Sequence, residues 1–156
     1  MSNAVRFVAD AMLGKLARWL RILGYDTLYN PAWDDLELAR IARAEDRVLL
    51  TRDTPLAERR GVQTLFVQSE KPLEQLGQVF SALGLHSASA YSRCSVCNAP
   101  LQTVSREALK DRLPEFVLAN QHSFRECPHC GRVYWQGTHW QGMQEILNGL
   151  NGENSP

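Results

Sequence analysis

The sequence predicts an α/β fold, in which a parallel β-sheet is flanked by helices, followed by a small cysteine-rich module. Short apolar segments of strand type alternate with segments of helical spacing over residues 5–84, and all four cysteines lie after residue 93. Such alternation favours a parallel sheet with helices on its faces and right-handed crossovers. The 156 residues suffice for one small domain and a module stapled by a metal.

Hydrophobic periodicity and helix-ending residues assign the elements of the first part. The predicted elements are, in order, a strand at 6–9, a helix at 11–23, a strand at 27–29, a helix at about 35–44, a strand at 48–51, a short helix near 55, a strand at 64–67 and a helix at 72–83. In the first two helices, the residues predicted to face the core are Leu13, Leu16, Leu20, Leu23, Leu36, Leu38, Ile41 and Ala42.

Composition sets the class of protein and its expected location. Hydrophobic residues make up 44% and charged residues 22%, which is typical of a soluble globular protein. The net charge of zero gives no bulk attraction to a polyanion, so nucleic-acid binding would need local basic patches. No apolar run approaches the roughly 20 residues that span a bilayer, and the first residues lack the apolar core of a signal peptide. We therefore expect a cytoplasmic protein with no membrane partner.

The cysteines form two C-x-x-C pairs, Cys94 with Cys97 and Cys127 with Cys130. A two-residue gap lets both thiolates of a tight turn face one metal, and two such knuckles complete the tetrahedral sulfur set that Zn²⁺ favours. The alternatives are disulfides, which a cytosolic location disfavours, and a redox-active motif, which turn residues such as Gly131 disfavour. Four thiolates leave no open position, so the predicted zinc is structural.

The chain around these pairs has its own signals. With four cysteines present, neither His129 nor His139 is needed as a ligand. Apolar spacing between the pairs predicts a helix over 104–120, which Pro114 should kink or split. The segment 132–135 predicts a β-hairpin arm. A Ser/Ala linker at 87–90 separates a first domain at 1–86 from a second at 91–147, and the tail at 148–156 is predicted to be disordered.

Acidic residues follow three of the predicted strands. Asp10 ends the first strand, Asp35 opens the helix after the second, and Asp53 stands two residues past the third. The carboxyl ends of parallel strands share one edge of a sheet, where ligand sites lie. Clustered carboxylates repel, and Mg²⁺ or Mn²⁺ relieves that repulsion, activates water and clamps a phosphodiester. The spacing therefore suggests metal-assisted phosphodiester hydrolysis.

Helix capping is the competing interpretation of these acids. Asp34 and Glu37 fit a D-x-x-E capping box, which would explain both without a metal. Asp35 would then hold the first helical position without a side-chain capping role, so it is preferred as the ligand over its two neighbours. Asp10 and Asp53 could also cap the helices that follow them.

Basic residues accompany the first acid. Lys15, Arg18 and Arg21 recur along one side of the helix that follows Asp10, where they could meet a phosphate; a solvated helix face is the alternative. Further positive charge near Asp53 comes from Arg52, Arg59 and Arg60. The aromatic candidates for base stacking are Trp19 and Trp33, although such residues more often pack in or at the edge of a core.

Several blocks together resemble the Mut7-C family over about residues 5–147. They are the run at 7–26, the segments 35–38 and 47–53, and the two cysteine knuckles with 130–135 and 137–140. The resemblance implies a PIN-like nuclease domain at 1–86 fused to a zinc ribbon with a helical insertion at 91–147. It also implies that Asp10, Asp35 and Asp53 hold Mg²⁺ or Mn²⁺ to cut RNA, with Thr51 near the site. PIN sites often have a fourth acid, for which Glu58 is the candidate.

Two hypotheses of different classes follow. The first is a metal-dependent endoribonuclease acting on single-stranded or structured RNA, in which Lys15 and Arg18 bind phosphate and the zinc ribbon grips RNA or a protein partner. The second is a non-catalytic RNA-binding or ribosome-associated adapter, in which the acids are helix caps. A phosphatase with an aspartyl nucleophile would need a second Asp where the chain has Met12. The RNA class is open, since tRNA, rRNA and mRNA all fit.

Overall fold

The computed structural model describes residues 5–85 and 92–135, in two compact units that divide after Asn98. The first unit holds a four-stranded parallel sheet of order β2-β1-β3-β4. Its strands are β1 (Phe7–Ala9), β2 (Thr27–Tyr29), β3 (Val48–Thr51) and β4 (Thr64–Phe66). The predicted α/β class with a parallel sheet is therefore confirmed. The predicted limits at 86, 91 and 147, and the tail, lie outside the described residues and stay predictions.

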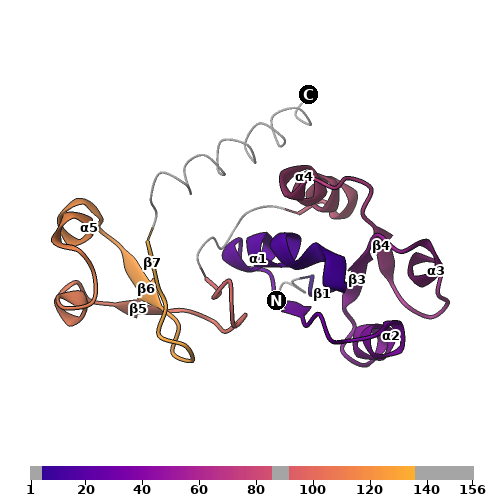
Figure 1. Cartoon of the computed structure of the whole chain (residues 1–156), viewed down its shortest axis with the longest axis horizontal. Coiled ribbons are helices and arrows are strands. Elements are labelled where there is room, and N and C mark those ends of the chain that lie inside the picture. The colour runs from indigo at the N-terminus through magenta and orange to yellow at the C-terminus, as the bar shows by residue number, and fades with distance from the viewer. Residues whose placement is uncertain (1–4, 86–91, 136–156) are drawn as a thin grey trace. The chain divides into compact units, whose positions relative to one another are not determined.

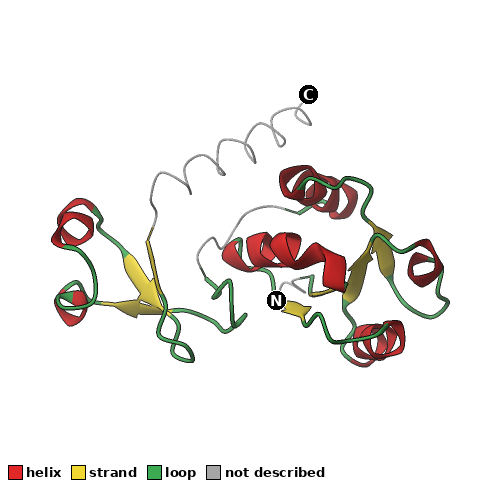
Figure 2. Ribbon diagram, viewed as in Figure 1, coloured by secondary structure: helices red, strands yellow, loops and turns green. Residues whose placement is uncertain are grey.

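Helices cover both faces of this sheet (Figures 1 and 2). They are a 3-10 turn η1 (Ala11–Leu13), α1 (Gly14–Ile22), α2 (Asp35–Ala44), α3 (Thr54–Ala57) and α4 (Pro72–Leu83). Helices α1 and α4 pack together, α2 packs on β1 and β3, and α3 packs on β3 and β4. The helix predicted over 11–23 is divided into η1 and α1, because the chain makes a tighter turn directly after Asp10.

The central strand β1 explains why both faces must be covered. Phe7, Val8 and Ala9 are all fully buried, although successive strand residues point to opposite faces. The Phe7 ring meets Tyr25 edge-on, and Tyr25 meets Phe80 of α4 in the same way. On the other face, Val8 belongs to a second apolar cluster; its remaining buried members are Leu38, Ile41, Ala42, Leu49 and Leu56. The core prediction was wrong for Leu36, which is 64% exposed.

Strand order places a topological switch between β1 and β3. Both β2 and β3 pair with β1 in parallel register, so the chain leaves β1 on one side for β2 and returns to β3 on the other. In such doubly wound sheets, ligands bind outside the carboxyl ends of the strands at the switch point. Asp10 and Asp53 follow the two strands that flank it.

The second unit is built on an antiparallel sheet of order β5-β6-β7. Its elements are β5 (Gln102–Val104), η2 (Glu107–Leu109), α5 (Glu115–Asn120), β6 (Phe124–Glu126) and β7 (Val133–Trp135). Its core consists of Leu109, Leu118 and Phe124. The start of the helix predicted over 104–120 was wrong, because Val104 pairs with Phe124 in the sheet. Pro114 does split that segment, since it caps α5.

Strands β6 and β7 form the predicted hairpin around the second cysteine pair. Within the described ranges, no helix is both long enough and apolar enough to cross a membrane.

Candidate functional site

A buried threonine joins two of the predicted acids. The Thr51 hydroxyl donates a hydrogen bond of 2.9 Å to Oδ2 of Asp10 and accepts one of 2.9 Å from the backbone N–H of Asp53. Thr51 is fully buried at the end of β3, and the Asp10 backbone N–H bonds the carbonyl of Leu50 in the same strand. The ends of β1 and β3 are thus locked together, and both carboxylates lie at the switch point.

The two acids differ in how far capping occupies them. Asp10 is the N-cap of η1, and its Oδ1 accepts from the backbone N–H of Ala11 at 2.7 Å. Asp53 holds the N-cap position of α3 but makes no side-chain capping bond there. The capping interpretation therefore accounts for part of Asp10 and leaves the Asp53 carboxylate without that role.

The acids at the start of α2 are arranged as the helix-capping interpretation predicted. Asp34 is the N-cap of α2 and accepts from the backbone N–H of Glu37 at 2.8 Å. The Glu37 carboxylate instead pairs with exposed Arg40, three residues on, with the shortest N–O distance at 2.5 Å. Asp35, the first residue of α2, is exposed and close enough to the other acids to interact with them. Asp34 and Glu37 thus serve the helix.

Electrostatics tie Asp35 to the other two acids. Partial desolvation and the negative charges of Asp53 and Asp10 raise the pKa of Asp35, although the residue is exposed, and the positive charge of Arg59 opposes them. Repulsion between nearby carboxylates is what a bound cation would relieve. Their spacing limits how it would be held. Among the described residues, no three acidic groups have ligand oxygens all within 4.8 Å of one another. The three carboxylates as placed therefore do not form a tight all-protein cage for a cation.

The four cysteines come together as the sequence predicted. The Sγ atoms of Cys94, Cys97, Cys127 and Cys130 all lie within 4.8 Å of one another, and none forms a disulfide. A tetrahedral thiolate set at Zn–S distances of about 2.3 Å fits within that spacing. Among the histidines that the structure describes, none is part of this group; His129 contributes its backbone N–H, and His139 lies outside the described residues.

Backbone and arginine contacts shape both knuckles. The N–H of Cys97 donates to Sγ of Cys94 at 3.3 Å, and the N–H of Cys130 donates to Sγ of Cys127 at 3.4 Å. Such contacts orient the sulfurs toward a shared centre. In the second knuckle, Gly131 has φ +79°, which favours glycine, and its carbonyl accepts from Arg112 at 2.6 Å. The cysteine set is thus a candidate structural zinc site.

Comparison with known proteins identifies the family of this chain. The family model described as the Mut7-C RNase domain matches residues 5–147. The chain belongs to the Mut7-C family. It is also similar to the human protein named Exonuclease mut-7 homolog, at 33% identity over an alignment of 119 residues that covers 70% of this chain. That stretch is 14% of the human protein's length. No solved structure matches significantly.

The basic residues on α1 of this Mut7-C domain lie in two different environments. Lys15 and Arg18 of α1 are exposed, as a phosphate contact requires. The prediction that Arg21 continues this basic stripe was wrong. Arg21 is only 6% exposed and bonds three backbone carbonyls of its own unit. The stripe prediction followed helical spacing only, whereas the last turn of α1 is covered by another chain segment.

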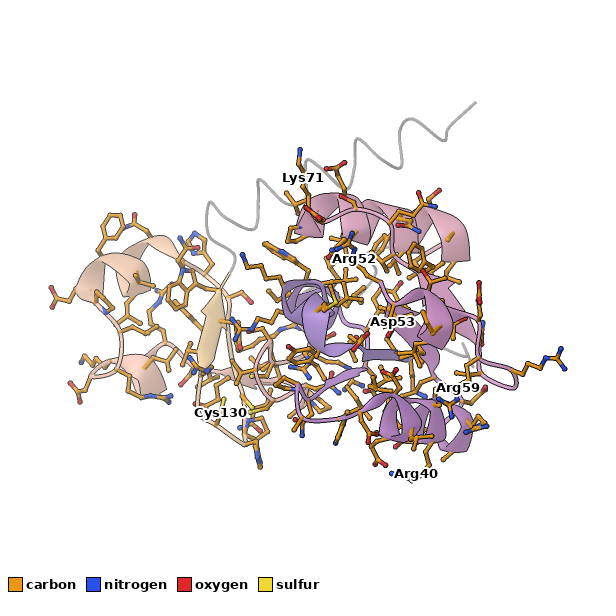
Figure 3. The ribbon with its side chains drawn as sticks, turned by 45° about the vertical axis from the view of Figure 1, so that its right-hand side comes forward. Arg40, Arg52, Asp53, Arg59, Lys71 and Cys130 are labelled. Carbon is orange, nitrogen blue, oxygen red and sulfur yellow. The ribbon has the colours of Figure 1, made fainter. Side chains whose placement is uncertain are left out.

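One basic residue gains importance from the tertiary structure. In the view of Figure 3, Asp53 lies between Arg52 and Arg59. The positive charge of Arg59 acts to lower the pKa of Asp35. The sequence showed Arg59 only as further positive charge near Asp53. Glu58, the candidate fourth acid, is exposed at the end of α3 and is not among the charges that shift Asp35.

The tryptophan candidates are half-buried. Trp33 packs against the apolar cluster that contains Val8 and Leu38, so packing accounts for it. Trp19 is also partly buried, on α1.

Proposed function

We propose that this Mut7-C domain is a Mg²⁺- or Mn²⁺-dependent ribonuclease of the PIN type. The observation that carries the proposal is the set of three acids after neighbouring parallel strands, with Thr51 holding Asp10 beside Asp53 and Asp35 coupled to both through its charge. Family membership supports a nuclease role, and the name of the human relative points the same way.

The roles of the residues follow from their chemistry. A bound divalent cation would supply Lewis acidity at the phosphodiester. Asp10 and Asp53 would be its direct ligands, because their backbones are fixed at the switch point, and Asp35 would hold it through water. Thr51 orients Asp10 by donating to Oδ2, which leaves its other lone pairs for the ion. Arg59 would limit repulsion among the acids.

The surroundings suit a single strand of RNA. Lys15 and Arg18 are exposed on the helix that begins just past Asp10, where they can bind flanking phosphates. Met12 and Leu36 are 65% and 64% exposed and lie within two residues of Asp10 and Asp35. Apolar side chains at such a site can contact unstacked bases, which a duplex does not offer. The zinc ribbon is proposed to add contacts to RNA or to a protein partner.

Cleavage of a labelled single-stranded RNA tests the proposal. Cleavage should require Mg²⁺ or Mn²⁺ and should fall at least about a hundredfold in Asp10→Asn and in Asp53→Asn, a loss of roughly 2.7 kcal/mol of transition-state stabilisation. Asp111→Asn, an exposed acid in the second unit, is the matched control and should cleave normally. Unchanged cleavage by both site variants, each folded, would refute the proposal.

The position of cleavage needs its own substrate. The human relative is named an exonuclease, whereas we propose that this domain cuts internally. A circular RNA distinguishes the two, because it has no end at which an exonuclease could start. Linearisation of the circle by wild-type protein but not by Asp10→Asn supports internal cleavage.

A non-catalytic RNA-binding adapter is the second candidate. The capping bonds of Asp10 and Asp34, and the wide spacing of the carboxylate oxygens, favour it. Binding of labelled RNA in EDTA, followed by addition of Mn²⁺, separates the two functions. The adapter would bind tightly in EDTA and leave the RNA intact after Mn²⁺ is added.

A further inference from the structure

A buried arginine in the first unit holds the knuckle of Cys94 and Cys97. The Arg21 guanidinium donates to the carbonyls of Ser95 and Val96 at 3.0 and 3.1 Å, and these residues lie between the two cysteines. Its Nε donates at 2.8 Å to the carbonyl of Thr27, the first residue of β2. Burial lowers the pKa of Arg21, and the nearby sulfurs of Cys94 and Cys97 oppose this. One side chain thus joins α1, β2 and the knuckle.

Asn98, directly after the knuckle, connects it to the start of β2. Its side chain is almost fully buried; Oδ1 accepts from the backbone N–H of Thr27 at 3.0 Å, and Nδ2 donates to Asp26 at 2.8 Å. The Asn98 backbone has φ 66°, and its N–H bonds the Cys94 carbonyl. The backbone carbonyl and N–H of Thr27 are therefore bonded by Arg21 and Asn98, and both of these residues also bond the backbone of the knuckle.

The connection continues into the centre of the sheet. Asp26 pairs with buried Arg47 at 2.8 Å, and Arg47 donates to the carbonyl of Phe7 in β1 at 3.0 Å. Strand β2 is an edge of the sheet, so the groups on its outer side would otherwise need water or another partner. At Thr27, where the strand begins, Arg21 and Asn98 are those partners.

We propose that zinc in the cysteine site braces the first unit, with Arg21 and Asn98 as the positioning residues that couple the knuckle to β2. Zinc binding closes the knuckle of Cys94 and Cys97. The free energy of zinc binding therefore also stabilises the folded segments that the closed knuckle contacts. Zinc loss therefore loosens the end of α1 and the start of β2. That strand leads to Asp35, so the acidic edge depends on the distant thiolates. The brace itself does not require the proposed ribonuclease activity.

Hydrogen exchange on the whole chain tests the brace. Amide exchange is followed by mass spectrometry in zinc-loaded protein, and again after zinc is removed with a chelator under reducing conditions. Exchange in peptides over 20–29 should rise about tenfold or more on zinc removal, whereas β3 should keep its protection. An unchanged rate over 20–29, or a rise in β3 as large as that over 20–29, would overturn the proposal.

Variants supply the reciprocal measurement, because coupling between zinc and β2 must act in both directions. Arg21→Met keeps the alkyl stem, and Asn98→Gly keeps the positive φ; each should weaken zinc affinity by about tenfold to a hundredfold in competition with a chromogenic chelator. Arg43→Met, an exposed arginine of α2, is the matched control and should bind zinc normally. Equal affinity in the wild type and both variants would overturn the coupling.

Discussion

Replacement of Thr51 by valine tests the link between the two central acids. Valine keeps the shape of the fully buried side chain and removes both hydrogen bonds of the hydroxyl. The bond to the Asp10 carboxylate contributes about 1.5–3 kcal/mol and the bond from the Asp53 N–H about 0.5–1.5 kcal/mol. We therefore expect the unfolding free energy to fall by roughly 2–4 kcal/mol, because no cavity is created to add to this loss.

The assay compares Thr51→Val with Thr51→Ser by thermal unfolding and by RNA cleavage. Serine keeps the hydroxyl and loses one methyl group, at a cost of about 0.8 kcal/mol. The valine variant should melt about 8 °C or more below wild type and cleave at least about tenfold more slowly, since Asp10 loses the donor that orients it. A valine variant as stable and as active as the serine variant would refute this account of Thr51.

Three further predictions follow from the same structure. Mn²⁺ should raise the melting temperature of wild-type protein and should raise that of Asp35→Asn less, as differential calorimetry would show; equal gains would exclude Asp35 from the site. Although burial acts to raise it, hydrogen bonds from Arg47 and Asn98 hold the pKa of Asp26 below its ordinary value, so its stabilisation is present above pH 3.8 and is lost as the pH falls through its folded pKa. The melting-temperature difference between wild type and Asp26→Asn should therefore be large at pH 7 and shrink below pH 3.8, and a constant difference would contradict this. Met12→Ser and Leu36→Ser should raise KM for single-stranded RNA severalfold at unchanged stability, and an unchanged KM in steady-state kinetics would remove both residues from the RNA site.

Local signals in the sequence determined most of the elements of the first unit. Strands β1 to β4 and helices α2 and α4 lie where periodicity and end residues predicted them, since hydrogen bonds within a helix and side-chain alternation within a strand depend on near neighbours. The capping role of Asp34 was also local, because the bond that it accepts comes from three residues away. The cysteine cluster could be predicted because its spacing already meets the geometry of one tetrahedral ion.

Contacts between distant parts of the chain decided the rest. Helical spacing gave Lys15, Arg18 and Arg21 the same role, but the segment at 95–98 covers only Arg21. Leu36 matched the apolar pattern of its helix, yet its position in the first turn of α2 leaves it exposed. Val104 fitted the helical spacing, but it pairs with Phe124, twenty residues later, in the antiparallel sheet.

The candidate site shows the same division. The sequence placed Asp10, Asp35 and Asp53 at one edge of a sheet, because parallel strands end together. Only the tertiary structure decided that the Thr51 hydroxyl bonds both Asp10 and the backbone of Asp53. It also decided that the positive charge of Arg59 opposes the rise in the pKa of Asp35. A hydrogen bond or a charge interaction depends on distances of a few ångströms between atoms far apart in the chain, and those distances are fixed by packing, which a one-dimensional pattern does not encode.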